Sequence, residues 1–234
     1  MPERIVGVLG GMGPEATVDF LREIIRLTPA EKDQDHIPVI AYSDPRVPER
    51  TTAILHGGED PTPYLLRAAV TLEKAGAGIL AMPCNTAHYY LPRIKNAVGI
   101  PILDMIEETY ASTRDFTGGS GFVGLLATQG TVQSGVYHHV FERHGVKVLV
   151  PDAKDQECIQ GGIFQIKAGS YDLVRQDTFE IIGSKLAAAG AAAVILGCTE
   201  IPLGFNVNRV GYPVVNATRV LAQAAVDWAL GKRV

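Results

Sequence analysis

The chain has 234 residues, of which 47% are hydrophobic and 20% are charged, and its formal net charge at pH 7 is −4. This is the balance of a globular protein with room for two domains, and it excludes a disordered or low-complexity chain. The acidic net charge, with Lys and Arg scattered along the sequence, argues against nucleic-acid binding.

Targeting and membrane segments are not expected. Glycines and Pro14 interrupt the first apolar segment, and the apolar run at 186–198 is shorter than the roughly 20 residues that a membrane helix needs. The three cysteines, Cys84, Cys158 and Cys198, are too few and odd in number for a disulfide framework. We therefore expect free thiols and a cytoplasmic protein without a membrane partner.

Short aliphatic and β-branched segments alternate with longer segments of helical pattern, which is typical of βαβ units and a parallel sheet. The predicted strands are residues 4–10, 38–43, 77–83, 100–104, 121–128, 146–151, 192–198 and 212–216. The predicted helices are residues 15–27, 63–75, 131–144, 172–189 and 218–230.

The two halves of the chain repeat the same pattern in the same order. Residues 6–20 align with 123–137, and 74–88 align with 188–202, so the offset stays between 112 and 117 through the closing segments. This indicates duplication. We predict two similar α/β/α domains with mainly parallel sheets, related by pseudo-twofold symmetry, with the active site in the cleft between them. Residues 1–103 with 212–234 would form the N-terminal domain, and residues 104–211 the second domain.

Cys84 and Cys198 occupy equivalent positions of this repeat, each at the end of a predicted strand and each followed by a threonine within two residues. Open parallel sheets bind ligands at the carboxyl ends of their strands. A thiol that opens a helix should have a lowered pKa. Two such thiols on facing domains could remove a proton from one face of a carbon and return one to the other face, which is a racemisation or epimerisation. Cys158 lacks this setting, and we expect a small core residue there.

Four stretches carry a family resemblance: "GVLGGMGP" at 7–14, "MPCNTAH" at 82–88, "GLLATQGT" at 124–131 and "LGCTEIPL" at 196–203. Together they resemble the aspartate/glutamate racemase family, and the "GGMG" turn favours its aspartate racemase branch over typical glutamate racemases. The resemblance implies racemisation of an acidic amino acid by two cysteines without a cofactor or metal, in a homodimer.

Carried over to this sequence, the resemblance makes Cys84 and Cys198 the acid/base pair. The residues predicted to bind the substrate are Met12, Arg50, Asn85, Thr86, Ala87, Thr131, Lys167, Thr199 and Glu200. Asn85, Thr86 and Ala87 would hold the α-carboxylate, and Arg50 and Lys167 the side-chain carboxylate, since a guanidinium or ammonium offsets its desolvation.

Three threonines, Glu200 and one long connection have further expected roles. Thr86, Thr131 and Thr199 could donate hydroxyl hydrogen bonds to the charge that develops on the substrate. Glu200 could orient the substrate ammonium or cap the helix after Cys198. Residues 43–65 combine proline, glycine and charge, so we expect a long connection that carries Arg50 and closes over the substrate as a lid.

Other readings leave features of the sequence unexplained. "GMGPEA" at 11–16 fits a dinucleotide fingerprint, but Asp33 and Asp35 precede the next predicted strand instead of ending it. Lys167 as a pyridoxal-phosphate lysine, or a two-lobed anion sensor, would leave the paired cysteines without a task. Cys84 with His88 lacks the further ligands of a usual zinc site. Glutamate or broad-specificity racemases, hydantoin racemases and maleate isomerases of the same scaffold stay open as alternatives to aspartate.

Overall fold

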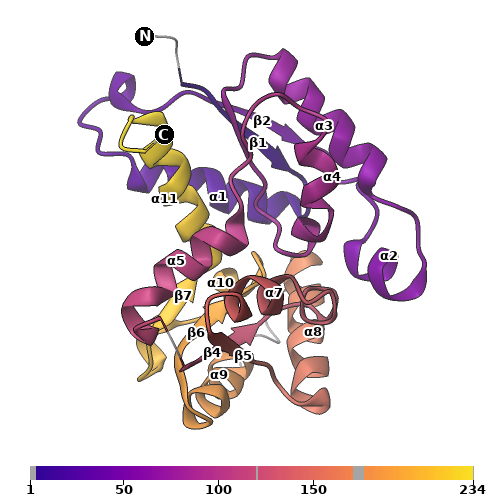
Figure 1. The fold of residues 1–234 in the computed structure, drawn as a ribbon, viewed down its shortest axis with the longest axis vertical. Helices are drawn as coiled ribbons and strands as arrows, with labels where there is room; N and C mark the ends of the chain where they lie inside the picture. The colour runs from indigo at the N-terminus through magenta and orange to yellow at the C-terminus, as the bar shows by residue number, and fades with distance from the viewer. Residues whose placement is uncertain (1–3, 120, 171–176, 234) are drawn as a thin grey trace.

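The computed structural model describes residues 4–119, 121–170 and 177–233, and its core consists of two parallel sheets (Figure 1). The first sheet has the order β2-β1-β3, and the second β5-β4-β6-β7. The strands are β1 (Val6–Gly10), β2 (Val39–Ser43), β3 (Ile79–Ala81), β4 (Gly121–Leu126), β5 (Val146–Leu149), β6 (Ala191–Leu196) and β7 (Val214–Asn216). Every strand pair is parallel, as the alternation of strand and helix patterns predicted.

Helices connect the strands and cover both sheets. They are α1 (Pro14–Leu27), α2 (Arg50–His56), α3 (Thr62–Lys74), α4 (Leu91–Lys95), α5 (Met105–Thr117), α6 (Gln129–Gln133), α7 (Val136–Glu142), α8 (Ala153–Lys167), α9 (Thr178–Ala188), α10 (Ile201–Gly204) and α11 (Ala217–Ala229), with short 3-10 helices η1 (Asp33–Asp35), η2 (Thr86–Tyr90) and η4 (Val207–Arg209). No helix among the described residues is long and apolar enough to cross a membrane.

The duplication is visible in the strand order. β1, β2 and β3 of the first sheet correspond to β4, β5 and β6 of the second. The fourth position holds β7 in the second sheet, and in the first sheet a single bridge between Leu80 and Ile102. The predicted strand at 100–104 is therefore reduced to one bridge. The prediction of two similar α/β domains is confirmed.

Each half ends with a helix that packs on the other half. α5 follows the bridge at Ile102, and its Ile106 joins the buried cluster of β4, β5 and β6. α11 follows β7, and its Leu221 and Val226 join the buried cluster of β1, β3 and α1. The Asp104 and Asn216 side chains begin the two helices in the same way, each accepting two backbone N–H groups. Because β7 pairs with β6, the predicted boundary at residue 212 was wrong for 214–216, which belong to the second sheet.

Several predicted elements differ from the observed ones for local reasons. The helix predicted at 131–144 is divided into α6 and α7 at Gly135, whose φ of 71° is left-handed. The segment 43–65 contains α2, so it is not a continuous loop. The predicted helix at 172–189 begins at Thr178 in the part that the structure describes, and residues 172–176 lie outside the described residues.

Candidate functional site

The residues that follow β1, β2, β3, β4 and β6 converge where the two halves meet. Cys84 follows β3 and Cys198 follows β6, so the two cysteines occupy equivalent strand ends of the duplicated unit. Their exposed fractions are 5% and 6%, so both thiols are nearly excluded from solvent. The pairing of equivalent positions follows the pattern that the repeat in the sequence predicted.

A cavity of about 520 Å³ lies beside these strand ends. The first half contributes the turn Gly11–Glu15 after β1 and four residues after β2, while Lys167 and Glu200 come from the second half. The four residues after β2 are Pro45, Val47, Glu49 and Arg50. Gly11 allows this turn to pass close to the neighbouring loop, because its φ is 94° and a Cβ there would lie 2.4 Å from the backbone of Asp44. The cavity therefore lies between the two halves and has charged groups of both signs on its wall.

Glu200 connects Cys198 with this cavity. Its Oε2 accepts hydrogen bonds from the Sγ of Cys198 at 3.0 Å and from the Oγ1 of Thr199 at 3.2 Å. Its Oε1 accepts from the backbone N–H of Gly13 at 3.4 Å, which belongs to the first half. Glu200 is only 2% exposed, yet it lines the cavity, so its carboxylate is placed between the thiol and the cavity.

The expected low pKa of the cysteines is wrong for Cys198. Burial raises the pKa of this thiol well above its ordinary value, the Glu200 carboxylate raises it further, and the Lys167 ammonium opposes them. The following helix α10 has only four residues, so its dipole is small. In this arrangement Cys198 is a protonated thiol that donates to Glu200.

Cys84 approaches the cavity from the first half. It belongs to a buried apolar cluster with Met12 and Val47, and both of these line the cavity. Neither cysteine is itself among the lining residues, so each sulfur is placed behind the wall, Cys84 next to apolar groups and Cys198 next to Glu200. Ala87, in η2 after Cys84, is fully buried.

Three threonine hydroxyls join the two halves near Cys84. The Oγ1 of Thr86 lies 2.9 Å from that of Thr128 and 2.8 Å from that of Thr131, and the last two are 2.9 Å apart. Thr86 comes from the first half and the other two from the second. Thr86 and Thr131 were predicted site residues, whereas Thr128 was missed. Its sequence signal is local, because its side chain caps α6 by accepting the N–H of Thr131.

The side-chain amide of Asn85 has one atom with a hydrogen-bond partner and one without among the described residues. Its Oδ1 accepts a hydrogen bond from the Tyr137 hydroxyl at 2.6 Å, and its Nδ2 has no hydrogen-bond partner among the described residues. Tyr137 is fully buried on α7 of the second half. Sequence reasoning missed it, because an aromatic residue on a helix is usually a core residue. The tyrosine holds the amide group of Asn85 in a single orientation.

Arg50 is not the exposed lid residue that the sequence suggested. It is the first residue of α2, is 7% exposed, and its Nη1 donates to the carbonyls of Val47 at 3.2 Å and Pro48 at 3.1 Å. Its Nε has no hydrogen-bond partner among the described residues. The guanidinium is thus held in the cavity wall before any substrate arrives.

Two further charged groups flank Arg50. Lys167 is exposed at the end of α8 and lines the cavity opposite the first half. Glu49, which sequence reasoning missed, caps α2 and also lines the cavity. Burial favours a higher pKa for Glu49, but backbone N–H groups of Thr52 and Thr51 and the nearby cations hold its pKa below the usual value. Glu49 is therefore an anion beside the two cations.

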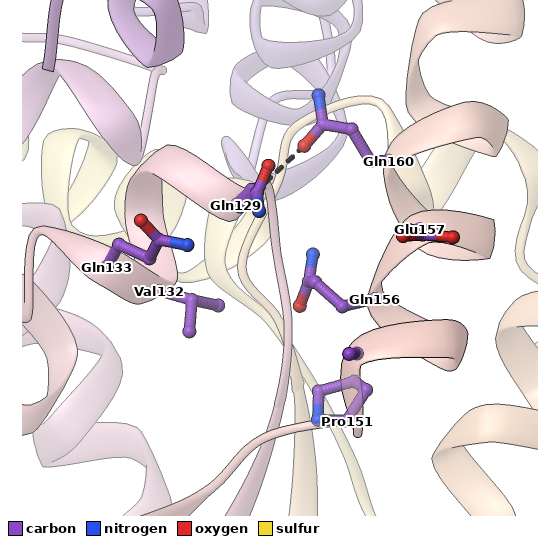
Figure 2. A pocket seen from close by; sticks show the side chains of 8 residues that line it. Gln129, Val132, Gln133, Pro151, Gln156, Glu157 and Gln160 are labelled. Carbon is purple, nitrogen blue, oxygen red and sulfur yellow. Dashed lines mark hydrogen bonds between the residues drawn. The ribbon is translucent and has the colours of Figure 1, made fainter. Parts of the chain in front are cut away.

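The second half has a cavity of about 330 Å³ at the corresponding strand ends, after β4 and β5 (Figure 2). Its wall is formed by α6 and α8 and carries four glutamines, Gln129, Gln133, Gln156 and Gln160, with Glu157 as the charged lining residue. The Gln160 side chain accepts the backbone N–H of Gln129 at 2.8 Å. Among the residues that the structure describes, this wall offers no cation, which makes the cavity a poor site for a carboxylate. Cys158, expected in the core, is exposed on α8, because its position faces solvent instead of a neighbouring element.

Comparisons with known proteins agree over nearly the whole chain. The family model described as Asp/Glu/Hydantoin racemase matches residues 9–225. The broad specificity amino-acid racemase RacX of Bacillus subtilis (strain 168) is 27% identical over 227 residues, which are 95% of this chain and 97% of RacX. The structure of Picrophilus torridus aspartate racemase matches this one with a TM-score of 0.84 at 32% identity, and the match covers 97% of this chain and 94% of the racemase. An aspartate racemase homologue from Pyrococcus horikoshii OT3 shares the fold, with a TM-score of 0.78 at 24% identity and coverage of 98% and 100%.

Proposed function

The chain belongs to the Asp/Glu/hydantoin racemase family, whose named members are isomerases, and on that premise we propose that it interconverts L- and D-aspartate by a two-base mechanism without a cofactor. The observation that carries this proposal is the pair of buried cysteines at equivalent strand ends of the two halves, one next to Met12 and Val47 and the other next to Glu200, all three of which line the same cavity. In this proposal the duplicated unit would present two equivalent proton-transfer groups to opposite faces of the substrate. Inversion at a carbon atom needs this arrangement.

The charged wall suggests how the substrate would be held. The Arg50 guanidinium and the Lys167 ammonium would bind the side-chain carboxylate, and a fork held by Val47 and Pro48 loses little entropy on binding. The free Nδ2 of Asn85, with the hydroxyls of Thr86 and Thr131, would donate to the α-carboxylate. Negative charge develops there when the α-carbon loses its proton, so donors that are already in place stabilise the transition state.

The proton transfers use the two thiols in turn. We propose that Cys84 acts as the thiolate and Cys198 as the thiol in one direction. The Cys84 sulfur takes the α-proton, the electron pair stays on the carbon, and the Cys198 thiol donates its proton to the opposite face. The cysteines then hold exchanged protonation states, and the reverse direction starts from that state. Glu200 accepts the hydrogen bond from the Cys198 thiol, which favours the protonated form that this step needs.

A broad-specificity amino-acid racemase is the second candidate. Glu15, Glu49 and Glu200 line the cavity together with the two cations, so the wall also offers anions to an ammonium or a neutral polar side chain. The similarity to RacX points the same way. A panel of L-amino acids tested at equal concentration separates the two candidates, since a strong preference for aspartate supports the first.

A cytoplasmic location and a homodimer complete the proposal. The three free cysteines are compatible with a reducing compartment, and the homodimer follows from the resemblance. Sedimentation equilibrium of the purified protein distinguishes a dimer from a monomer, and a monomer at all concentrations would contradict the second statement.

Proton NMR of the protein with L-aspartate in deuterated buffer, followed by chiral chromatography, tests the function. We expect loss of the α-proton signal and appearance of D-aspartate without added pyridoxal phosphate. The variants Cys84→Ser and Cys198→Ser should each reduce kcat by about 10²-fold or more, because a serine hydroxyl is a far weaker acid than a thiol and hardly ionises to the anion that would act as the base. Full activity in either variant would contradict the two-base assignment, and no exchange with aspartate or glutamate would contradict the acidic substrate.

A further inference from the structure

His88 lies four residues after Cys84 in the same motif, and the proposed reaction does not use it. It is only 4% exposed, and both of its ring nitrogens have backbone partners. Nδ1 lies 2.9 Å from the carbonyl oxygen of Cys84, and Nε2 accepts the N–H of Met105 at 3.0 Å. Because a backbone N–H can only donate, Nε2 carries no proton, and the hydrogen-bond network assigns the neutral tautomer with the proton on Nδ1.

The two partners of this ring belong to different parts of the site. Cys84 follows β3 of the first half, and Met105 is the first residue of α5, which packs on the second sheet. The imidazole therefore links the backbone of Cys84 to the N-terminus of α5, the helix that leads from the first half into the second. The N-cap Asp104 begins the same helix, and its carboxylate accepts from the N–H groups of Ile106 and Glu107.

The titratable neighbours of His88 come from three elements. Lys95 of α4, Asp104 before α5 and His139 of α7 line a crevice of about 360 Å³ together with His88. Lys95 pairs with Asp104 at 3.5 Å. Burial lowers the pKa of His88 most and the Lys95 ammonium adds to this, while the Asp104 carboxylate and the backbone groups of Cys84 and Leu103 oppose the shift. The net effect keeps the ring neutral, which is the form that both hydrogen bonds require.

We propose that His88 is a positioning residue for Cys84, holding the thiol in line with the substrate by bonding the Cys84 carbonyl and the N-terminus of α5 at once. This inference rests on the proposed function and adds to it the group that sets the position of one of the two bases. A displacement of about 1 Å can reduce the rate of a positioned reaction by about 10²-fold. Protonation would turn Nε2 into a donor that faces the N–H of Met105, so the hydrogen bond to Met105 would be lost.

Two substitutions distinguish a positioning role of His88 from a role in packing alone. His88→Leu keeps an apolar side chain of similar size and loses both hydrogen bonds. His88→Gln offers an amide N–H and a carbonyl oxygen, so it can replace both. We expect His88→Leu to lower kcat by about tenfold or more with little change in KM, and His88→Gln to recover most of the rate. If both folded variants retain the wild-type kcat, or if His88→Gln lowers kcat as much as His88→Leu does, the proposal is wrong.

The isotope effect on each enantiomer gives a readout that general destabilisation would not move. Each cysteine deprotonates one enantiomer. If only Cys84 is displaced, the primary deuterium isotope effect in His88→Leu should rise for the enantiomer that Cys84 deprotonates and stay near the wild-type value for the other. An equal rise for both enantiomers would indicate a general disturbance of the site and would overturn the positioning role.

Alkylation tests the position of Cys84 even if the protein does not racemise any amino acid. Iodoacetamide modification, followed residue by residue with mass spectrometry, reports the accessibility and orientation of each thiol. In His88→Leu we expect a changed rate at Cys84 with unchanged rates at Cys198 and at the exposed Cys158, and wild-type rates at all three in His88→Gln. An unchanged Cys84 rate in folded His88→Leu would refute the inference, whereas failure of the racemase assay alone would refute only the proposed function.

Discussion

Replacement of Gly130 by Ala should disturb the contact between the two halves beside the cavity. Gly130 lies in α6 of the second half, and a Cβ at this position would lie 2.8 Å from both the Cα and the Oγ1 of Thr51 in α2. Ordinary contacts of a Cβ begin at 3.4 Å, so the two helices would have to separate by about 0.6 Å. Because one of the two close atoms belongs to the backbone, rotation of a side chain cannot relieve the overlap.

The expected cost follows from this overlap. Overpacking of a close contact destabilises proteins by about 1 to 3 kcal/mol, which we take as the loss in the free energy of unfolding. α2 also begins with Arg50, whose guanidinium lines the cavity. A shift of this helix moves the proposed carboxylate site, so KM for aspartate should rise by about tenfold while kcat changes less.

Urea denaturation and steady-state kinetics measure the two effects separately. Gly161→Ala is the matched control, since Gly161 lies in α8 and a Cβ there meets nothing within 4 Å. That control should be neutral or stabilising by about 0.5 to 1 kcal/mol, because Ala favours a helix over Gly. If Gly130→Ala is as stable as the wild type and has the same KM, the close contact between α2 and α6 does not set the position of Arg50.

Three other substitutions or conditions test separate parts of the site. Glu200→Gln should lower the pKa of Cys198 by removing the neighbouring negative charge, as measured by the pH dependence of its alkylation, whereas Glu200→Asp should leave the pKa raised. Arg50→Ala should raise KM for aspartate by about tenfold or more, and an unchanged KM would exclude Arg50 from the carboxylate site. Burial lowers the pKa of His88 in the folded chain, so its contribution to stability should be complete above the ordinary His pKa of about 6.5 and be lost as the pH falls toward the lower folded value. Urea midpoints at a series of pH values should therefore fall more steeply for the wild type than for His88→Gln, and equal slopes would contradict this.

The elements that could be predicted from the sequence are those with strong local patterns. α1 and α11 agree with their predicted ranges within one residue, because each is amphipathic and begins with a clear signal, Pro14 in one case and the Asn216 cap in the other. α5 and α8 were missed. Their apolar residues are mixed with threonine, glutamine or glycine, so the apolar face becomes evident only from what covers it.

The candidate site likewise contains residues that the sequence indicates and residues whose role only the packed structure reveals. Cys84 and Cys198 could be found because the repeat places them at equivalent strand ends, and duplication is a property of the sequence itself. Thr128 and Tyr137 could not be found, since their importance comes from partners 42 and 52 residues away in the chain. The same holds for Glu49, which is an ordinary helix cap until its neighbours Arg50 and Lys167 are placed around one cavity.

The sequence by itself determined the alternation of parallel strands with helices, the duplication, and the two cysteines that the duplication relates. These depend on local propensity and on similarity between segments, which a single chain carries in its order of residues. Only the tertiary structure decided that Arg50 is buried, that the pKa of Cys198 is raised, and that His88 joins Cys84 to α5. Burial, charge interactions and hydrogen bonds between distant segments arise only when the two halves pack together, so no local pattern could have shown them.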